Sequence, residues 1–234
     1  MTNQLHDQTD TVEHTILPRM VSLAVHELRT PVTVVAGYLR MLLREQGGPL
    51  TEKQRKMIEE ADRACGRIGA LVSEMSEIGK LESHELGLAR MEFDLAALVT
   101  ETAAGLHDND RGVRLDVRAS DQKLPVAGDR VRIAAAVKAL LHSAVRERGE
   151  PGVIVAECRA VNGWGVVAIG DEAVLASLTR DAGANPPGFD EWRGGMGLAL
   201  PVARRVLEAH GGALWSASDG SSRAASALRL PLAS

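Results

Sequence analysis

This chain of 234 residues has few cysteines and few aromatic residues, and it has no excess of positive charge. The two cysteines, Cys65 and Cys158, lie far apart, which excludes a disulfide framework and a cysteine-ligated metal site. Aromatic residues make up 3% of the chain, so we expect a core of Leu, Val, Ile and Ala. The formal net charge of −4 and the pI of about 6.0 argue against nucleic acid as a partner.

Long apolar runs are also absent. No window approaches the roughly 18 consecutive apolar residues that a membrane span needs, and the first ten residues, MTNQLHDQTD, are polar and acidic, unlike a signal peptide. We therefore expect a cytoplasmic protein with no membrane partner. Hydrophobic residues at 45% and charged residues at 25% are typical of globular proteins, and the length allows one or two domains.

The first part of the chain shows two heptad patterns, with apolar residues spaced alternately by four and three. The first series is Val21, Val25, Leu28, Val32, Val35, Leu39 and Leu42, and the second is Met57, Ala61, Ala64, Ile68, Leu71, Met75 and Ile78. A Gln-Gly-Gly-Pro break separates them, and Thr51 with Gln54 predicts a capping box at the second start. These patterns predict a helical hairpin. Because one hairpin covers only part of two apolar seams, we expect a homodimer that forms a four-helix bundle.

Beyond residue 87 the pattern changes to short strand-like runs between helices, so we predict domains at 1–87 and 88–234. The second domain is expected to be an α/β sandwich with a mixed sheet. We predict helices at 94–106, 129–148 and 198–210, strands at 113–119, 153–161, 164–170, 213–218 and 225–230, and a long irregular connection at 171–194. Asn162-Gly163 is a strong hairpin signal between two of these strands.

A histidine on the first predicted helix is a candidate catalytic residue. The heptad assignment puts His26 and Glu27 on the side away from the seam, with Thr30 one turn after His26 on that side. Pro31 lies within the helix, where it removes a backbone donor and predicts a kink. A lone exposed histidine is more often only a solvated surface residue.

The whole string His-Glu-Leu-Arg-Thr-Pro, residues 26–31, resembles the H-box of sensor histidine kinases of two-component systems. The resemblance implies that His26 accepts the γ-phosphoryl group of ATP and passes it to an aspartate of a response regulator. Glu27 is then placed to act as general base, and Thr30 to orient water for dephosphorylation of the regulator. A second His-Glu-Leu at 84–86 is followed by Gly87 instead and is set aside.

A glycine-rich motif supports the same resemblance. The string Gly-Gly-Met-Gly-Leu-Ala-Leu at 194–200 precedes a predicted helix, whose free amides can hold phosphate oxygens. With residues 204–212 it resembles the glycine box and following helix of the histidine kinase ATP-binding domain, grouped with gyrase, Hsp90 and MutL. Gly195 and Gly197 are therefore expected to bind ATP, with Arg146 at its phosphates.

The chain departs from this family at other nucleotide-binding positions. The family's asparagine box, which ligates Mg²⁺, corresponds to 139–144 and has lost both asparagines; Ser143 or Glu147 can offer an oxygen instead, and the metal ligands stay unidentified. Strand alternation makes Asp171 the best match to the adenine-binding aspartate, although an ordinary loop aspartate is about as probable. Ala173 and Leu175 replace the glycines that follow it. Phe189 and Trp192 are loose substitutes for the usual aromatic box of the lid.

The leading hypothesis is a cytoplasmic, dimeric histidine kinase that uses ATP and Mg²⁺ and has a response regulator as its partner. An alternative is an ATP-independent histidine phosphotransferase or phosphatase with a decayed nucleotide site, and another is a non-enzymatic scaffold. Because only about 20 residues precede the H-box, we expect the signal to come from an upstream sensor protein or from outside this sequence.

Overall fold

The computed structural model describes residues 4–83, 87–106, 112–120, 122–183, 186–217 and 224–233. The chain divides into two compact units, Met1–Glu85 and Leu86–Ser234, which we describe separately. The second His-Glu-Leu string at 84–86 lies outside the described residues. Within the described residues, neither long helix contains an apolar stretch sufficient to cross a bilayer.

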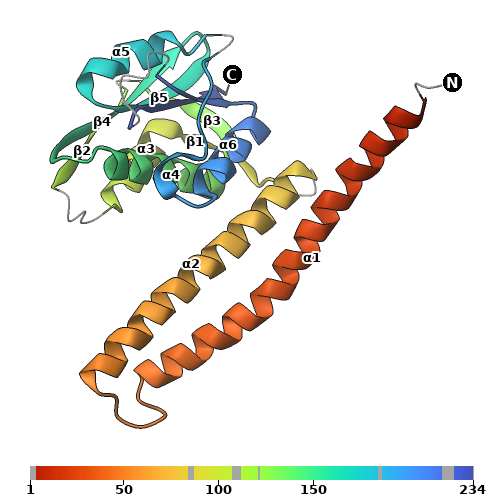
Figure 1. Cartoon of the computed structure of the whole chain (residues 1–234). Coiled ribbons are helices and arrows are strands. Elements are labelled where there is room, and N and C mark those ends of the chain that lie inside the picture. Colours follow the sequence, from red (N-terminus) through yellow and green to blue (C-terminus); the bar gives the residue numbers. More distant parts are fainter. Residues whose placement is uncertain are drawn as a thin grey trace. The chain divides into compact units, whose positions relative to one another are not determined.

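The first unit is a hairpin of two long helices, α1 (Gln4–Leu43) and α2 (Glu52–Glu82) (Figure 1). The predicted capping box is present at the start of α2: the Thr51 N–H donates to Gln54 Oε1 at 2.9 Å, and the Gln54 N–H donates to Thr51 Oγ1 at 3.3 Å. The helix α1 continues through Pro31 without interruption.

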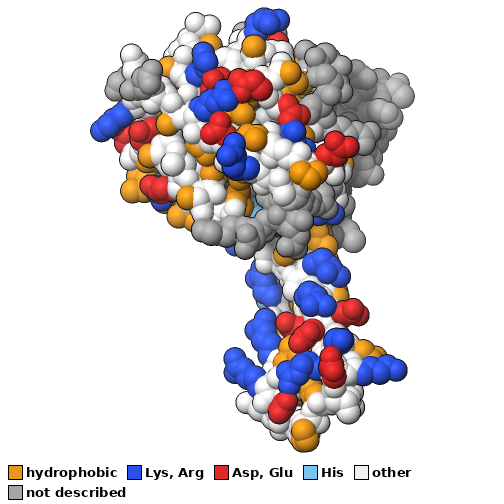
Figure 2. Space-filling view, turned by 90° about the vertical axis from the view of Figure 1, so that its left-hand side faces the viewer, with side chains coloured by type: hydrophobic (Ala, Val, Ile, Leu, Met, Phe, Trp, Pro, Cys, Tyr) orange, Lys and Arg blue, Asp and Glu red, His pale blue; other side chains and the backbone are white. Residues whose placement is uncertain are grey.

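The residues buried within the hairpin lie mostly beside the two predicted heptad series, since only Val25 is a member of either. Val25 and Ala36 of α1 and Cys65 and Val72 of α2 are buried, and the Cys65 thiol donates to the carbonyl of Val32 at 3.4 Å. Six large residues of the predicted seam are exposed in the single chain, namely Leu28, Val35, Leu42, Met57, Ile68 and Leu71, and most of the others are half-buried. Figure 2 shows apolar side chains interspersed with charged ones on the viewed face of the hairpin.

The second unit is built on a five-stranded sheet with strand order β2-β4-β5-β7-β6. The strands are β2 (Val113–Arg118), β4 (Gly152–Val161), β5 (Trp164–Gly170), β6 (Ala213–Ser216) and β7 (Ser226–Pro231). Because β2 pairs with β4 in parallel and the other pairs are antiparallel, the sheet is mixed, as predicted. Asn162 and Gly163 both have positive φ, as the tight turn between β4 and β5 requires.

A small second sheet pairs β1 (Arg90–Asp94) with β3 (Pro125–Asp129), and the sequence pattern did not predict it. Each strand has five residues and only partial burial, which leaves little periodic signal. Asp94 ends β1 and caps α3 (Leu95–Ala104), because its carboxylate accepts from the backbone N–H of Ala96 and of Leu124.

The expected irregular connection at 171–194 is wrong in its first half, where α5 (Glu172–Arg180) forms. Val174, Leu175 and Leu178 give this helix an apolar face that packs on the sheet with the buried Val155 and Trp215. In Figure 1, α5 covers one face of the sheet, and α3, α4 (Arg130–Glu147) and α6 (Ala199–Ala209) lie on the other. Both faces of the sheet are therefore covered.

Candidate functional site

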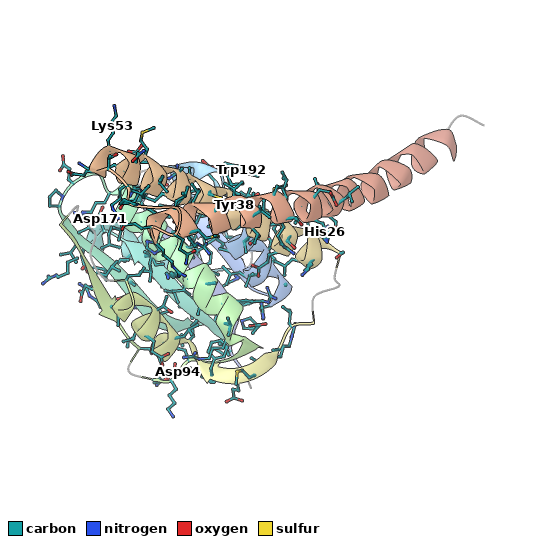
Figure 3. All side chains as sticks on the ribbon, turned by 90° about the horizontal axis from the view of Figure 1, so that it is seen from below. His26, Tyr38, Lys53, Asp94, Asp171 and Trp192 are labelled. Atoms are coloured by element: carbon teal, nitrogen blue, oxygen red, sulfur yellow. The ribbon has the colours of Figure 1, made fainter. Side chains whose placement is uncertain are left out.

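His26 lies on α1, and its imidazole is on the surface of the hairpin (Figure 3). The side chain is 77% exposed, and Nδ1 lies 3.5 Å from Oε1 of the equally exposed Glu27. This distance is at the limit of a hydrogen bond. When Glu27 accepts the Nδ1 proton, the lone pair of Nε2 is available to attack an electrophile.

Thr30 is exposed one turn after His26 on the same helix. Pro31 follows it and cannot donate a backbone hydrogen bond. The carbonyl of Glu27, one turn earlier, therefore loses its helical donor, while the Thr33 hydroxyl donates to the carbonyl of Arg29 at 2.8 Å. The three residues His26, Glu27 and Thr30 thus share an accessible stretch of α1.

In the second unit, the structure brings Arg146 of α4 to the glycine loop. Arg146 Nη1 donates to the carbonyl of Gly195 at 3.2 Å. Gly195 and Gly197 both have positive φ, at 56° and 65°, where a side chain would be strained. The loop leads directly into α6, and its backbone is in contact with the Arg146 guanidinium.

Ser143 and Glu147, the possible replacements for the missing asparagines, are both withdrawn from solvent. Ser143 is 0% exposed, and its hydroxyl has no hydrogen-bond partner among the described residues. The Glu147 carboxylate forms an ion pair with Arg193, with Oε1 at 3.8 Å from Nε and the two side chains 9% and 7% exposed.

These residues do not fit a Mg²⁺ ion in the arrangement observed. The position of the first asparagine is held by the apolar Ala139, Ser143 offers one inaccessible neutral oxygen, and Glu147 already balances an arginine. Within the described ranges, no group of three His, Cys, Asp or Glu residues is arranged to hold a metal ion. We therefore derive no chemical step through Mg²⁺.

Asp171, the predicted adenine-binding residue, lies between β5 and α5 (Figure 3) and forms an ion pair with Arg148. Arg148 also donates to the carbonyl of Val153 at 2.9 Å. Its guanidinium lies against Gly152, where a Cβ atom would overlap it. The carboxylate expected to accept from adenine is thus bound to a side chain of the same domain.

The segment 186–198, which we call the lid segment, is fixed at several points. The Ser216 N–H donates to the carbonyl of Gly188 at 3.2 Å, and the buried Glu191 accepts from Arg205 at 2.9 Å. Arg193 stacks over the Phe189 ring at 4.6 Å. Phe189 is buried whereas Trp192 is 69% exposed, so the two aromatic side chains of this segment have different environments.

The Arg193 side chain is almost completely withdrawn from solvent, with 7% exposed. Its Nη1 donates to Ser216 Oγ at 3.2 Å and to the carbonyl of Ala225 at 3.3 Å. Burial lowers the pKa of Arg193 from its ordinary value, and the charges of Glu147 and Asp190 oppose this shift.

Arg148 and Arg193 were not predicted at this site. Glu147 appeared there only as a possible metal ligand. One signal was available in the sequence. Glu147 lies between Arg146 and Arg148, and Arg193 lies close to the glycine motif, so ion pairs of Glu147 with an arginine were a possible prediction. Only the fold pairs these charges, since Glu147 and Arg193 lie far apart in the sequence.

The comparisons with known proteins agree with this organisation. The His Kinase A (phospho-acceptor) domain family matches residues 18–84. The circadian input-output histidine kinase CikA of Synechococcus elongatus is 26% identical, in an alignment that covers 89% of this chain and 32% of CikA. The chain spans about a third or less of the length of the curated relatives it matches.

Two solved structures share the fold. Full-length ShkA in complex with AMPPNP has a TM-score of 0.69 and 20% identity, and the match covers 93% of this chain and 46% of that one. The histidine kinase ThkA in complex with the response regulator protein TrrA has a TM-score of 0.57 and 20% identity, covering 98% and 66%.

Residues 18–84 thus match the His Kinase A (phospho-acceptor) domain family, and the chain as a whole is similar in sequence and in fold to histidine kinases.

Proposed function

We propose that this chain is the kinase core of a two-component signalling protein, which phosphorylates His26 with ATP and transfers the phosphoryl group to an aspartate of a response regulator. The observation that carries the proposal is the exposed imidazole of His26 beside the Glu27 carboxylate, within the matched phospho-acceptor domain. The bound AMPPNP named for ShkA and the regulator complex named for ThkA support ATP as the donor and a response regulator as the partner.

The first step is an in-line displacement at the γ-phosphorus of ATP. Nε2 of His26 forms the P–N bond while the bond from phosphorus to the β,γ-bridging oxygen breaks, and ADP leaves with that electron pair. The imidazole becomes cationic as the bond forms, and Glu27 stabilises it by accepting the hydrogen bond, or the proton, of Nδ1. The amides of the loop at Gly195 and Gly197, together with Arg146, supply positive potential for the phosphates.

In the second step a carboxylate oxygen of the receiver aspartate attacks the phosphorus. The P–N bond breaks and its electron pair returns to Nε2, while Glu27 gives back any proton that it took from Nδ1, so that the neutral imidazole is regenerated. The exposure of His26 is a requirement of this step, because the acceptor belongs to another protein. Thr30, one turn away on the same helix, is proposed to orient a water molecule when the phosphoaspartate of the response regulator is hydrolysed.

The functional unit is proposed to be a homodimer, since the seam residues left exposed in one hairpin are apolar and follow the heptad. The sensory region is proposed to lie in an upstream partner or in sequence beyond these 234 residues, in line with the short span of the relatives that this chain covers.

Incubation with γ-labelled ATP and Mg²⁺ tests the proposal. Wild type is expected to acquire label that is stable in base and lost in acid, as a P–N bond is, and His26→Gln is expected to acquire none. An active histidine kinase labelled in parallel serves as the positive control. An unlabelled wild type beside a labelled control would contradict autokinase activity and would favour the ATP-independent phosphotransferase.

A further inference from the structure

At the C-terminal end of α4, Glu147 and the C-cap residue Arg148 each take part in an arginine-carboxylate pair at the expected nucleotide site. Glu147 pairs with Arg193 of the lid segment, and Arg148 pairs with Asp171 at the end of β5. Arg146, the adjacent residue on α4, contacts the glycine loop two residues after Arg193. The charged groups of this part of the domain are thus directed at one another.

We propose that the Arg193–Glu147 ion pair is a latch, which holds the lid segment 186–198 closed on the domain and opens before a nucleotide is bound. The part of this inference that concerns ATP rests on the function proposed above. No metal is required for it, because both partners and their contacts belong to this chain.

The position of Arg193 supports a latch. Its guanidinium extends from the lid segment into the domain, where it contacts Ser216 of β6 and the carbonyl of Ala225. The side chain is 7% exposed, so the lid segment cannot lift from α4 while this group stays in place. Arg193 also lies two residues before Gly195, the candidate phosphate-binding glycine, and couples the latch directly to that loop.

The energetics of the pair favour reversible opening. Burying a carboxylate and a guanidinium costs desolvation energy, which attraction offsets only when the geometry and hydrogen bonding are good. At 3.8 Å the Nε–Oε1 distance is too long for a hydrogen bond, and Nη2 of Arg193 is buried with no partner among the described residues. Such a pair is expected to add little net stability, whereas loss of one partner strands the other charge.

The lid segment is also held at Glu191, two residues before Arg193. Glu191 is paired with Arg204 and Arg205 of α6, on a different element from Glu147. These contacts keep the segment attached when Arg193 leaves. Opening is therefore expected to be local, with Trp192 between the two anchors.

The test compares Glu147→Gln with wild type in the whole chain. This substitution keeps the shape of the side chain and removes only the charge that balances Arg193. Hydrogen exchange of peptides within 186–198 is expected to become at least about tenfold faster without nucleotide, and calorimetric titration with ATP and Mg²⁺ is expected to show about tenfold tighter binding, because more of the protein is in the open state. The exposed Glu150→Gln is the matched control and is expected to behave as wild type.

The outcomes separate the latch from the proposed function. Unchanged exchange in Glu147→Gln would overturn the latch, and so would a released lid segment with no gain in affinity when wild type binds ATP. A released lid segment with no ATP binding in any variant would support the latch and overturn the proposed use of ATP. Should Glu147→Gln fail to fold by circular dichroism, Arg193→Gln removes the other partner and is judged by the same two measurements.

Discussion

Arg148 binds Asp171, the carboxylate that sequence reasoning assigned to adenine. The arginine also donates to the Val153 carbonyl, and its guanidinium fits there because Gly152 has no side chain. The Asp171 carboxylate at the end of β5 is thus already paired with the Arg148 guanidinium of the same domain. Any ligand that approaches Asp171 with hydrogen-bond donors competes with this guanidinium.

Arg148→Gln is expected to release Asp171. The unfolding free energy should fall by about 1 kcal/mol, because the pair is only partly buried and is screened by solvent. Affinity for ATP should rise a few-fold, since the carboxylate no longer has an internal partner. Urea denaturation and ATP titration measure the two effects.

The matched control for Arg148→Gln is Arg146→Gln on the same helix. Arg146 contacts the glycine loop instead of Asp171, so its loss is expected to weaken ATP binding. Equal changes in the same direction for both variants would show that Arg148 does not compete for Asp171.

Glu27→Gln is expected to slow phosphorylation of His26 by about a hundredfold, the lower range for loss of a general base. The amide keeps the size of the side chain but cannot take the Nδ1 proton. Single-turnover labelling at saturating ATP measures the rate. Glu60→Gln, an exposed substitution of the same type on α2, should retain the wild-type rate; if Glu27→Gln does so as well, Glu27 has no role as a base.

Lysine at the exposed seam positions Leu28 and Val35 is expected to dissociate the proposed homodimer, because each charge would have to be buried in the bundle. Analytical ultracentrifugation at micromolar concentration should show a dimer for wild type and a monomer for the double variant. Val34→Lys, exposed outside the heptad seam, is the control and should stay dimeric. A monomeric wild type would refute the four-helix bundle.

The buried thiol of Cys158 predicts a pH dependence of stability. Burial raises the pKa of Cys158 from 9.0 to about 12, with smaller contributions from Asp94 and Glu157. A raised pKa means that the unfolded thiol ionises first. The stabilising effect is therefore complete below pH 9 and is lost as the pH rises from 9 toward 12.

Urea denaturation at pH 8 and pH 10 measures this effect. Between pH 9 and pH 10 the unfolding free energy should fall by up to about 1.4 kcal/mol from this group. Lysine and tyrosine side chains also titrate at high pH, so the comparison is with Cys158→Ala, in which the decline should be smaller by that amount. Identical pH profiles would contradict the buried-thiol explanation.

Strong periodic signals predicted most of the fold, and short or partly buried segments escaped prediction. The two heptad patterns, the capping box at Thr51 and the Asn162-Gly163 turn each specify local structure through their own residues. The helix α5 was missed because the glycine and proline residues near it suggested a loop, whereas its apolar face is stabilised by packing on the sheet.

The candidate site divides along the same line. His26, Glu27 and Thr30 are neighbours on one helix, so the sequence places them together without tertiary information. Arg146 and Gly195 come from distant segments and meet only in the folded domain. Both were expected near the phosphates of ATP, but their contact with each other was not predicted.

By itself, the sequence determined the helical hairpin, the mixed α/β architecture and the outward position of His26, because these depend on periodicity and on interactions within a few residues. Tertiary structure alone decided the partners of Asp171 and Glu147, since each pairs with an arginine from another element. Which charges are buried together depends on how α4, the sheet and the lid segment pack, and that information is distributed over the whole second unit.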